Sequence, residues 1–122
     1  MKTISWLILA AAILPIVAAG ISKAGGKQYN NNNPRSWLAN QEGWRARANA
    51  AQANLFESLP FFYAAVLFAL FKMADPATLV SLMLAWIVLR MIYLAVYLVG
   101  YGLVRTVVWV LGLGVNIVIL FL

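Results

Sequence analysis

The residues able to do chemistry gather at one level on two neighbouring stretches of the chain. Glu57 lies fifteen residues before Lys72, and Arg90 lies fifteen residues after Asp75. If residues 72–75 form the turn of a helical hairpin, both side chains lie about 22 Å from that turn. An ionised group buried at such a depth in a membrane usually pairs, faces a cavity or serves a function. The spacing predicts a Glu57–Arg90 ion pair or a shared polar site. The simpler alternative is a pair that only holds the hairpin together.

Further polar side chains lie on the same two helical faces. At 100° per residue, one face about 80° wide carries Arg47, Ala50, Asn54 and Glu57. Spacings of three and four residues place on one stripe Arg90, Tyr93, Tyr97, Tyr101 and Arg105. Together the two faces predict one polar pocket. An interfacial aromatic belt is the other interpretation of the tyrosines, and it suits Tyr101 but does not explain why Tyr93 and Tyr97 share a face with a buried arginine.

The composition shows what kind of molecule must position these residues. Of the 122 residues, 65% are hydrophobic and only 10% are charged, and the mean hydropathy is +0.88. Soluble domains carry about a quarter charged residues. The absence of Cys and His excludes disulfides, thiolate or histidine metal sites and a His-dependent triad. The net charge of +6 comes from basic residues that flank apolar runs, which is typical of membrane topology and not of nucleic-acid binding.

The charges divide the chain into four apolar stretches, each long enough to cross a hydrocarbon core. We predict an all-α integral membrane protein with one domain over residues 1–122, a bundle of four transmembrane helices at residues 3–21, 44–72, 76–100 and 104–122. The polar stretch 22–43 is predicted to be a loop, because Gly25, Gly26 and Pro34 oppose a continuous helix. The first stretch has a second interpretation as a cleaved signal peptide.

Lysine and arginine are unevenly distributed between the two ends of the predicted bundle. One end holds Lys23, Lys27, Arg35, Arg45, Arg47 and Arg105, whereas the other holds only Lys2 and Lys72. Basic residues favour the cytoplasmic side of a membrane. The distribution predicts that the loop 22–43 is cytoplasmic and that both termini lie outside.

Two blocks of sequence resemble the MAPEG family, the membrane-associated proteins in eicosanoid and glutathione metabolism. RARANAAQANLFESLPFF, residues 45–62, is similar to the family's second helix, where an Arg-rich start is followed by A-x-N-x-x-E and a proline; here Asn54, Glu57 and Pro60 carry that pattern. The block RMIYLAVY with a later arginine is similar to the third helix, through Arg90, Tyr93, Tyr97 and Arg105. The NPR tripeptide at residues 33–35 is similar to bacterial members, which implies a bacterial inner membrane.

The resemblance implies a homotrimer that binds glutathione between neighbouring subunits. It also implies that the second substrate is a lipophilic small molecule from the lipid bilayer, which is either conjugated to glutathione or reduced by it. It implies a catalytic role for Arg105 in stabilising the thiolate, with Tyr97 close by. The glutathione-binding residues that it implies are Arg35, Arg47, Asn54, Glu57, Arg90 and Tyr93. These types suit the tripeptide, because carboxylate and amide oxygens bind its ammonium and arginine binds its carboxylates. No metal is implied, and Ala50 and Ala53 stand where family enzymes often have arginine.

Two other functions remain open at this point. The first is a small four-helix transporter of cations or drugs that uses Glu57 as its membrane carboxylate, although such exporters carry that group in their first helix. The second is a non-catalytic protein with the same fold.

Overall fold

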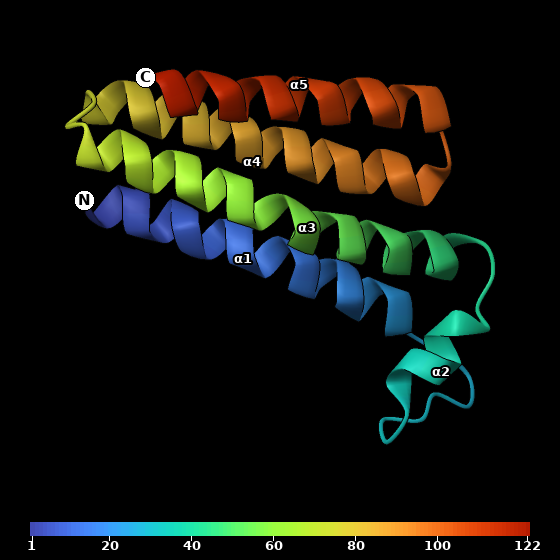
Figure 1. The fold of residues 1–122 in the computed structure, drawn as a ribbon. Helices are drawn as coiled ribbons and strands as arrows, with labels where there is room; N and C mark the ends of the chain where they lie inside the picture. Colours follow the sequence, from blue (N-terminus) through green and yellow to red (C-terminus); the bar gives the residue numbers. More distant parts are fainter.

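The computed structural model describes all residues 1–122 and consists of helices joined by short connections. The helices are α1 (Lys2–Lys23), α2 (Pro34–Ala39), α3 (Trp44–Phe71), α4 (Pro76–Val99) and α5 (Gly102–Phe121). The four long helices run antiparallel to their neighbours along the chain, and both termini lie at the same end of the bundle (Figure 1). Each of these four is long and apolar enough to cross a membrane. Their bounds lie close to the ranges expected from the charges.

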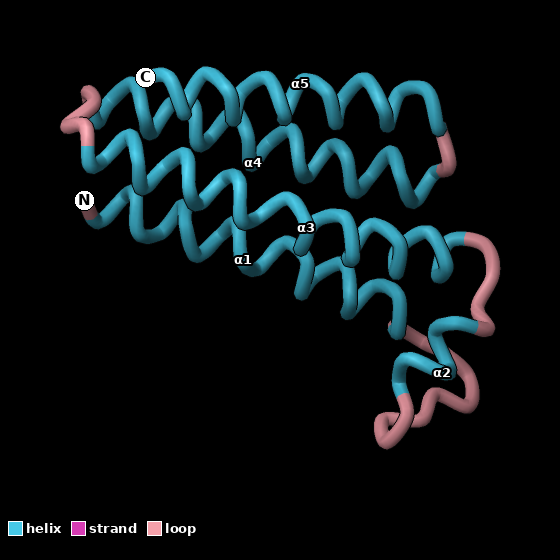
Figure 2. The backbone as a smooth tube through the Cα atoms, in the orientation of Figure 1, coloured by secondary structure: helices cyan, strands magenta, loops and turns pink.

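The segment between α1 and α3 is more ordered than a plain loop, because residues 34–39 form the short helix α2 (Figure 2). Pro34 is the first residue of α2, a position where proline is favoured since its missing N–H has no helical partner to lose. The sequence opposed only a continuous helix over residues 22–43, and the short helix that begins at Pro34 was not expected. The Trp37 Nε1 donates to the Lys27 carbonyl at 3.1 Å, and the Tyr29 ring meets the Trp37 ring edge-on at 5.1 Å.

The turns between the long helices are closed by local hydrogen bonds and by one glycine. The Asp75 carboxylate caps α4, accepting from the Thr78 N–H at 2.9 Å and from the Thr78 hydroxyl at 2.6 Å. These bonds favour the ionised form and lower the pKa of Asp75 below its ordinary value. At the other end of α4, Gly100 has a φ of 95°, a left-handed conformation that glycine adopts without steric cost.

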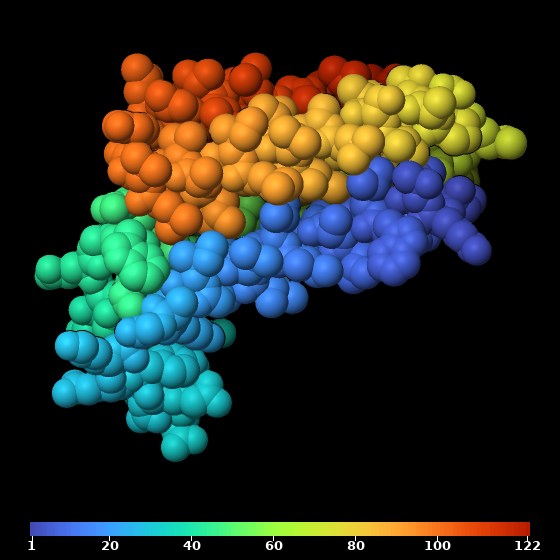
Figure 3. Space-filling view, turned by 180° about the vertical axis from the view of Figure 1, so that it is seen from behind, coloured from blue at the N-terminus to red at the C-terminus, as the bar shows by residue number.

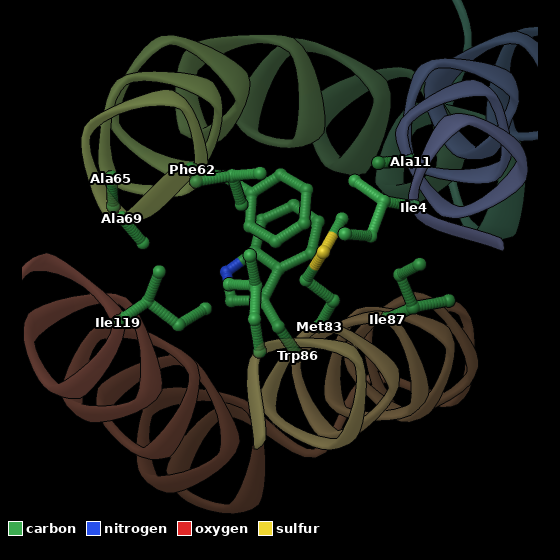
Figure 4. Close-up of a cluster of buried hydrophobic side chains, with 11 residues drawn as sticks. Ile4, Ala11, Phe62, Ala65, Ala69, Met83, Trp86, Ile87 and Ile119 are labelled. Atoms are coloured by element: carbon green, nitrogen blue, oxygen red, sulfur yellow. The ribbon is translucent and has the colours of Figure 1, made fainter. Parts of the chain in front are cut away.

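Aromatic and small side chains fill the centre of the bundle between the four long helices (Figure 4). The Phe62 ring of α3 stacks on the Trp86 ring of α4, with centroids 3.9 Å apart and planes within 12° of parallel. Ala65 and Ala69 are fully buried, and such small residues let transmembrane helices approach closely. Many large apolar side chains point outward instead, as expected of helices that face lipid.

The helices α1 and α5 each pack against both α3 and α4. From behind, α1 runs alongside α4, and the segment after it extends beyond the bundle (Figure 3). The Tyr63 hydroxyl donates to the Ile8 carbonyl at 2.9 Å, which joins α3 to α1. The Lys72 ammonium donates to the Leu120 carbonyl at 2.8 Å and joins the end of α3 to the end of α5. The central pair of helices, α3 and α4, is therefore held on both sides.

We expect Phe62→Ala to destabilise the bundle, because it removes the ring that stacks on Trp86 and leaves a cavity. Lipid is as apolar as the core, so no transfer free energy is lost, and the expected loss is about 2 kcal/mol where soluble cores lose roughly 3–5. Equilibrium unfolding in mixed micelles measures it. Phe71→Ala is the control, since Phe71 is 83% exposed; equal losses in both variants would contradict a packed core at Phe62.

Candidate functional site in the groove of α3, α4 and α5

Two adjoining pockets open between α3, α4 and α5. The outer pocket, nearer the α4–α5 turn, has a volume of about 230 Å³ and is lined by Asn54, Tyr93, Tyr97, Arg105, Thr106 and Trp109. The inner pocket, deeper along the bundle, has about 260 Å³ and is lined by Asn54, Glu57, Ser58, Phe61, Arg90, Trp109, Leu113 and Asn116. Asn54 and Trp109 belong to both. The two pockets are therefore neighbours that share a wall.

The outer pocket combines a cation with aromatic hydroxyls. The Arg105 guanidinium carbon lies over the Tyr97 ring, 4.5 Å from its centroid, and the Tyr97 ring meets the Tyr93 ring edge-on at 5.6 Å. A cation over an aromatic face is held in place by the ring quadrupole. Arg105 also closes the first turn of α5, where its backbone N–H donates to the Tyr101 carbonyl at 3.0 Å. This arrangement offers one fixed positive charge and two hydroxyls to an anion.

The inner pocket contains an arginine that is almost completely buried. Arg90 is 2% exposed, and its guanidinium carbon lies 5.1 Å from the centroid of the Trp86 ring and 5.8 Å from that of Tyr93. It packs against Gly112 of α5, where a side chain would collide with Arg90 Nη2 and come within 2.9 Å of its Cζ. Gly112 is therefore required for the close approach of the guanidinium to α5.

Glu57 and Arg90 share the inner pocket without forming the ion pair that was one of the two expected outcomes. No nitrogen of Arg90 lies within 4.0 Å of the Glu57 carboxylate, and Arg90 Nε and Nη1 have no hydrogen-bond partner. The two side chains point in different directions. Arg90 turns inward to the space beside Gly112, between aromatic faces, whereas Glu57 remains exposed at the pocket's mouth. Of the two sequence expectations, the shared polar site describes the geometry.

Asn116 is the second buried polar residue of the inner pocket, after Arg90. It is 3% exposed, and its Oδ1 has no hydrogen-bond partner. It lies one helical turn after Gly112, so the two residues occupy the same face of α5. Asn116 is the only amide or charged side chain after Arg105 in α5, and the packing of that helix brings it to the same pocket as Arg90.

Three residues of the two predicted faces, and Arg35 from the segment before α3, lie outside both pockets. The Arg47 Nε donates to the Leu98 carbonyl at 3.0 Å, so this carbonyl near the end of α4 has a hydrogen-bond partner. Tyr101 is exposed and precedes α5. Arg35 and Ala50 line a third pocket of about 370 Å³ on the α1–α2 side of α3, together with Lys23, Asn49 and Gln52. The single pocket expected from the sequence is thus divided among three places on the molecule.

Several lining residues were not predicted from the sequence. Ser58 and Phe61 follow Glu57 within one turn of α3, and Thr106 and Trp109 follow Arg105 within the first turns of α5. Their types are common in lipid-facing helices, so type alone carries no signal. Their spacing of three to four residues from a charged pocket residue is the signal that would have found Phe61 and Trp109.

We expect Gly112→Ala to displace the Arg90 guanidinium and to destabilise the protein by about 1–3 kcal/mol through overpacking. Gly114→Ala is the matched control in the same helix, because nothing lies within 4 Å of the added carbon. It should be neutral or stabilise by up to about 1 kcal/mol, since alanine is the better helix former. Thermal unfolding of both variants in one detergent tests this. Equal midpoints would contradict the close contact between Arg90 and α5.

Comparison with known proteins places the chain in a family. The sequence model of the MAPEG family matches residues 3–122, nearly the whole chain. No curated protein and no solved structure matches. The match agrees with the four long apolar helices and with the two sequence blocks that carry the resemblance. The chain belongs to the MAPEG family, membrane-bundle proteins that include glutathione-dependent transferases and peroxidases.

Proposed function

We propose that the protein is a membrane-bound glutathione-dependent transferase or peroxidase that acts on lipophilic electrophiles. The outer pocket is the observation that carries the proposal, because Arg105 over the Tyr97 ring offers a fixed cation to a thiolate. A thiol with a pKa near 8.5 is only slightly ionised at neutral pH, and a neighbouring arginine lowers that pKa and increases the reactive fraction. The Tyr97 hydroxyl is a second donor for the same sulfur.

The remaining polar groups of the groove suit the other end of glutathione. The Asn54 amide and the exposed Glu57 carboxylate lie on one flank of α3 at the two pockets. A carboxylate and an amide oxygen bind an ammonium through charge-assisted hydrogen bonds. The γ-glutamyl end of the tripeptide then lies along α3, and the thiol lies near Arg105 of α5.

A neighbouring copy of the chain would supply what one groove lacks. The outer pocket holds about 230 Å³, which is below the roughly 300–1,000 Å³ usual for small-molecule sites. Its only cation is Arg105, whereas Arg35 and Lys23 line the pocket on the other flank of α3. In a closed ring of identical subunits, one flank of each subunit faces the opposite flank of the next. In the proposed homotrimer, Arg35 of one copy binds a glutathione carboxylate held by the next.

The two proposed substrates reach the groove from different sides, glutathione from water and the electrophile from the bilayer. The positive-inside rule places the loop 22–43 and the nearby outer pocket at the cytoplasmic side, where the water-soluble thiol is available. A lipophilic electrophile partitions into the bilayer and approaches between the exposed apolar side chains of α5. The proposed location is a bacterial inner membrane with both termini outside.

The cation-transporter alternative is disfavoured by the surroundings of Glu57. Its inner pocket also contains the Arg90 guanidinium, which has no carboxylate within ion-pair distance. A positive charge there repels a cationic substrate, and the repulsion is strong because little water screens it. The non-catalytic alternative keeps the fold but predicts no thiol binding.

We expect detergent-purified protein to bind glutathione saturably, with the thiolate visible by its ultraviolet absorbance. Arg105→Ala should raise the apparent pKa of the bound thiol toward about 8.5, so the thiolate signal at neutral pH falls while some binding remains. Glu57→Gln should weaken binding by about tenfold through loss of one charge-assisted hydrogen bond. Calorimetry and absorbance titrations measure both.

Ser81→Ala is the control for these titrations, because Ser81 is exposed on α4 and its hydroxyl bonds only to the Ala77 carbonyl at 3.0 Å. It should bind as the wild type does. No binding by the wild type at several millimolar glutathione would overturn the proposal and favour a non-catalytic member of the fold.

We expect the inactive variants Arg35→Ala and Arg105→Ala to complement each other when they are mixed before assembly. A site that takes Arg105 from one copy and Arg35 from the next is intact wherever the two variants adjoin in the right order. Random mixing at equal amounts then restores about a quarter of the wild-type rate, because heterologous rings repeat one contact around the symmetry axis. Activity that never exceeds that of the separate variants would place both arginines in one subunit's site or in none.

A further inference from the structure

We propose that the inner pocket binds a small monovalent inorganic anion, such as chloride, between the Arg90 guanidinium and the Asn116 amide. The inference goes beyond the proposed function and does not depend on it, because the site needs neither a thiol nor an electrophile. Three observations carry it: a buried cation without a counter-ion, an amide that leans toward this cation, and a wall that is otherwise largely apolar.

The first observation is that the protein does not balance the charge of Arg90. Arg90 is 2% exposed, no carboxylate oxygen lies within 4.0 Å of its nitrogens, and its Nε and Nη1 have no hydrogen-bond partner. The rings of Trp86 and Tyr93 lie beside the guanidinium, but an aromatic ring offers only its quadrupole and no negative charge. A buried ion without a partner destabilises the folded state. An anion that accepts hydrogen bonds from these nitrogens removes that cost.

The second observation is that α5 directs Asn116 toward the guanidinium. Arg90 packs against Gly112, and Asn116 follows Gly112 by one turn of the same helix. Helical side chains lean toward the N-terminus of their helix, so the Asn116 amide leans back toward Gly112 and the guanidinium beside it. Asn116 is 3% exposed, and its Oδ1 has no partner. A half-turn of the amide presents its N–H donors on the side of Arg90, which adds a neutral donor to the charged ones.

The third observation is the rest of the pocket wall. Phe61, Trp109 and Leu113 contribute aromatic and aliphatic surface, and the pocket has a volume of about 260 Å³. This is room for one small ion with a few waters, each of which takes about 30 Å³. Glu57 is the only carboxylate of the pocket, and it is exposed at the mouth. The deeper part, between Arg90 and Asn116, therefore combines positive charge with apolar walls.

The depth of Arg90 determines which anions fit. Arg90 lies roughly 8 Å below the interface of a hydrocarbon core about 30 Å thick, so an anion must leave most of its water to reach it. That cost rises steeply with the charge of the ion, and one guanidinium offsets only one negative charge. Sulfate and inorganic phosphate are therefore excluded. Nitrate and iodide, which hold water more weakly than chloride does, should bind more tightly.

The test is thermal unfolding in a neutral detergent at constant ionic strength, where chloride, nitrate or iodide replaces gluconate, a monovalent anion too large and too hydrated for the pocket. Above its Kd, each tenfold increase in nitrate should raise the unfolding midpoint by about 4 °C, because the anion binds the folded protein only. General salt effects run in the opposite order, since sulfate is the ion that stabilises folded proteins without binding. A midpoint that follows this general order would overturn the inference.

Four variants locate the site. Arg90→Met should abolish the nitrate shift, and Asn116→Leu should raise the apparent Kd by about tenfold through loss of one hydrogen bond to a charged ligand. Arg105→Met is the matched control, because it removes the cation of the outer pocket and should leave the shift in place. Glu57→Gln should lower the Kd severalfold, since it removes a like charge from the mouth. If Arg90→Met does not fold, the saturable broadening of the chloride NMR line by the wild type, reversed by nitrate and weakened in Asn116→Leu, tests the same site.

Other results would assign the charge of Arg90 differently and overturn the inference. A shift that disappears in Arg105→Met and persists in Arg90→Met would place the anion in the outer pocket. Chloride binding found only in Glu57→Gln would make Glu57 the counter-ion of Arg90. Glutathione that displaces nitrate in simple competition would assign Arg90 to a carboxylate of the tripeptide. The proposed function is tested separately, because glutathione binding is measured in gluconate, and its failure would leave the anion site standing.

Discussion

The Arg90 guanidinium, buried between α4 and α5, is the constraint that organises the groove. Its burial between the Trp86 and Tyr93 rings and against Gly112 requires three features at once. An aromatic ring must lie one helical turn from Arg90, a glycine of α5 must face the Arg90 guanidinium, and α5 must approach α4 closely. The Phe62–Trp86 stack extends the same aromatic column into the core that joins α3 to α4. The site and the core are therefore continuous, since the ring that supports the arginine is also the ring at the centre of the bundle.

The level of each residue along the bundle could be predicted from the sequence, but its direction around the helix could not. Rise per residue is fixed, so the equal spacing of Glu57 and Arg90 from the hairpin turn was enough to bring them to one pocket. Direction depends on which face is apolar, and a helix surrounded by lipid and apolar neighbours is apolar on nearly all faces. Arg90 consequently turned to Gly112 and not to Glu57. No pattern in the sequence distinguishes a glycine that admits a guanidinium from Gly114, which faces open space.

The direction of a side chain around its helix, which the sequence does not predict, also explains why the basic residues lie in different places on the molecule. Arg47 shares a helical face with Asn54, yet its Nε donates to the Leu98 carbonyl near the end of α4, because an unpaired carbonyl at a helix end is costly near the membrane. Arg35 belongs to a segment whose helix α2 was not expected, and it follows that segment to the α1–α2 side of α3. In each case a backbone requirement, a helix end or a short helix after a proline, decided the position of a long flexible side chain.

The two cations of the groove differ in surroundings in a way that suits two different tasks. Arg105 lies near the end of the bundle, partly exposed, beside hydroxyls that can share an anion with water. Arg90 is sealed from water by aromatic rings and by α5. Coulomb interaction strengthens as the dielectric falls, so the outer cation suits the binding of a charge that is already present. The inner one is almost completely buried, so an anion that binds to it must first leave water. In the proposed function, the thiol comes from the cytoplasm and meets the outer, partly exposed cation.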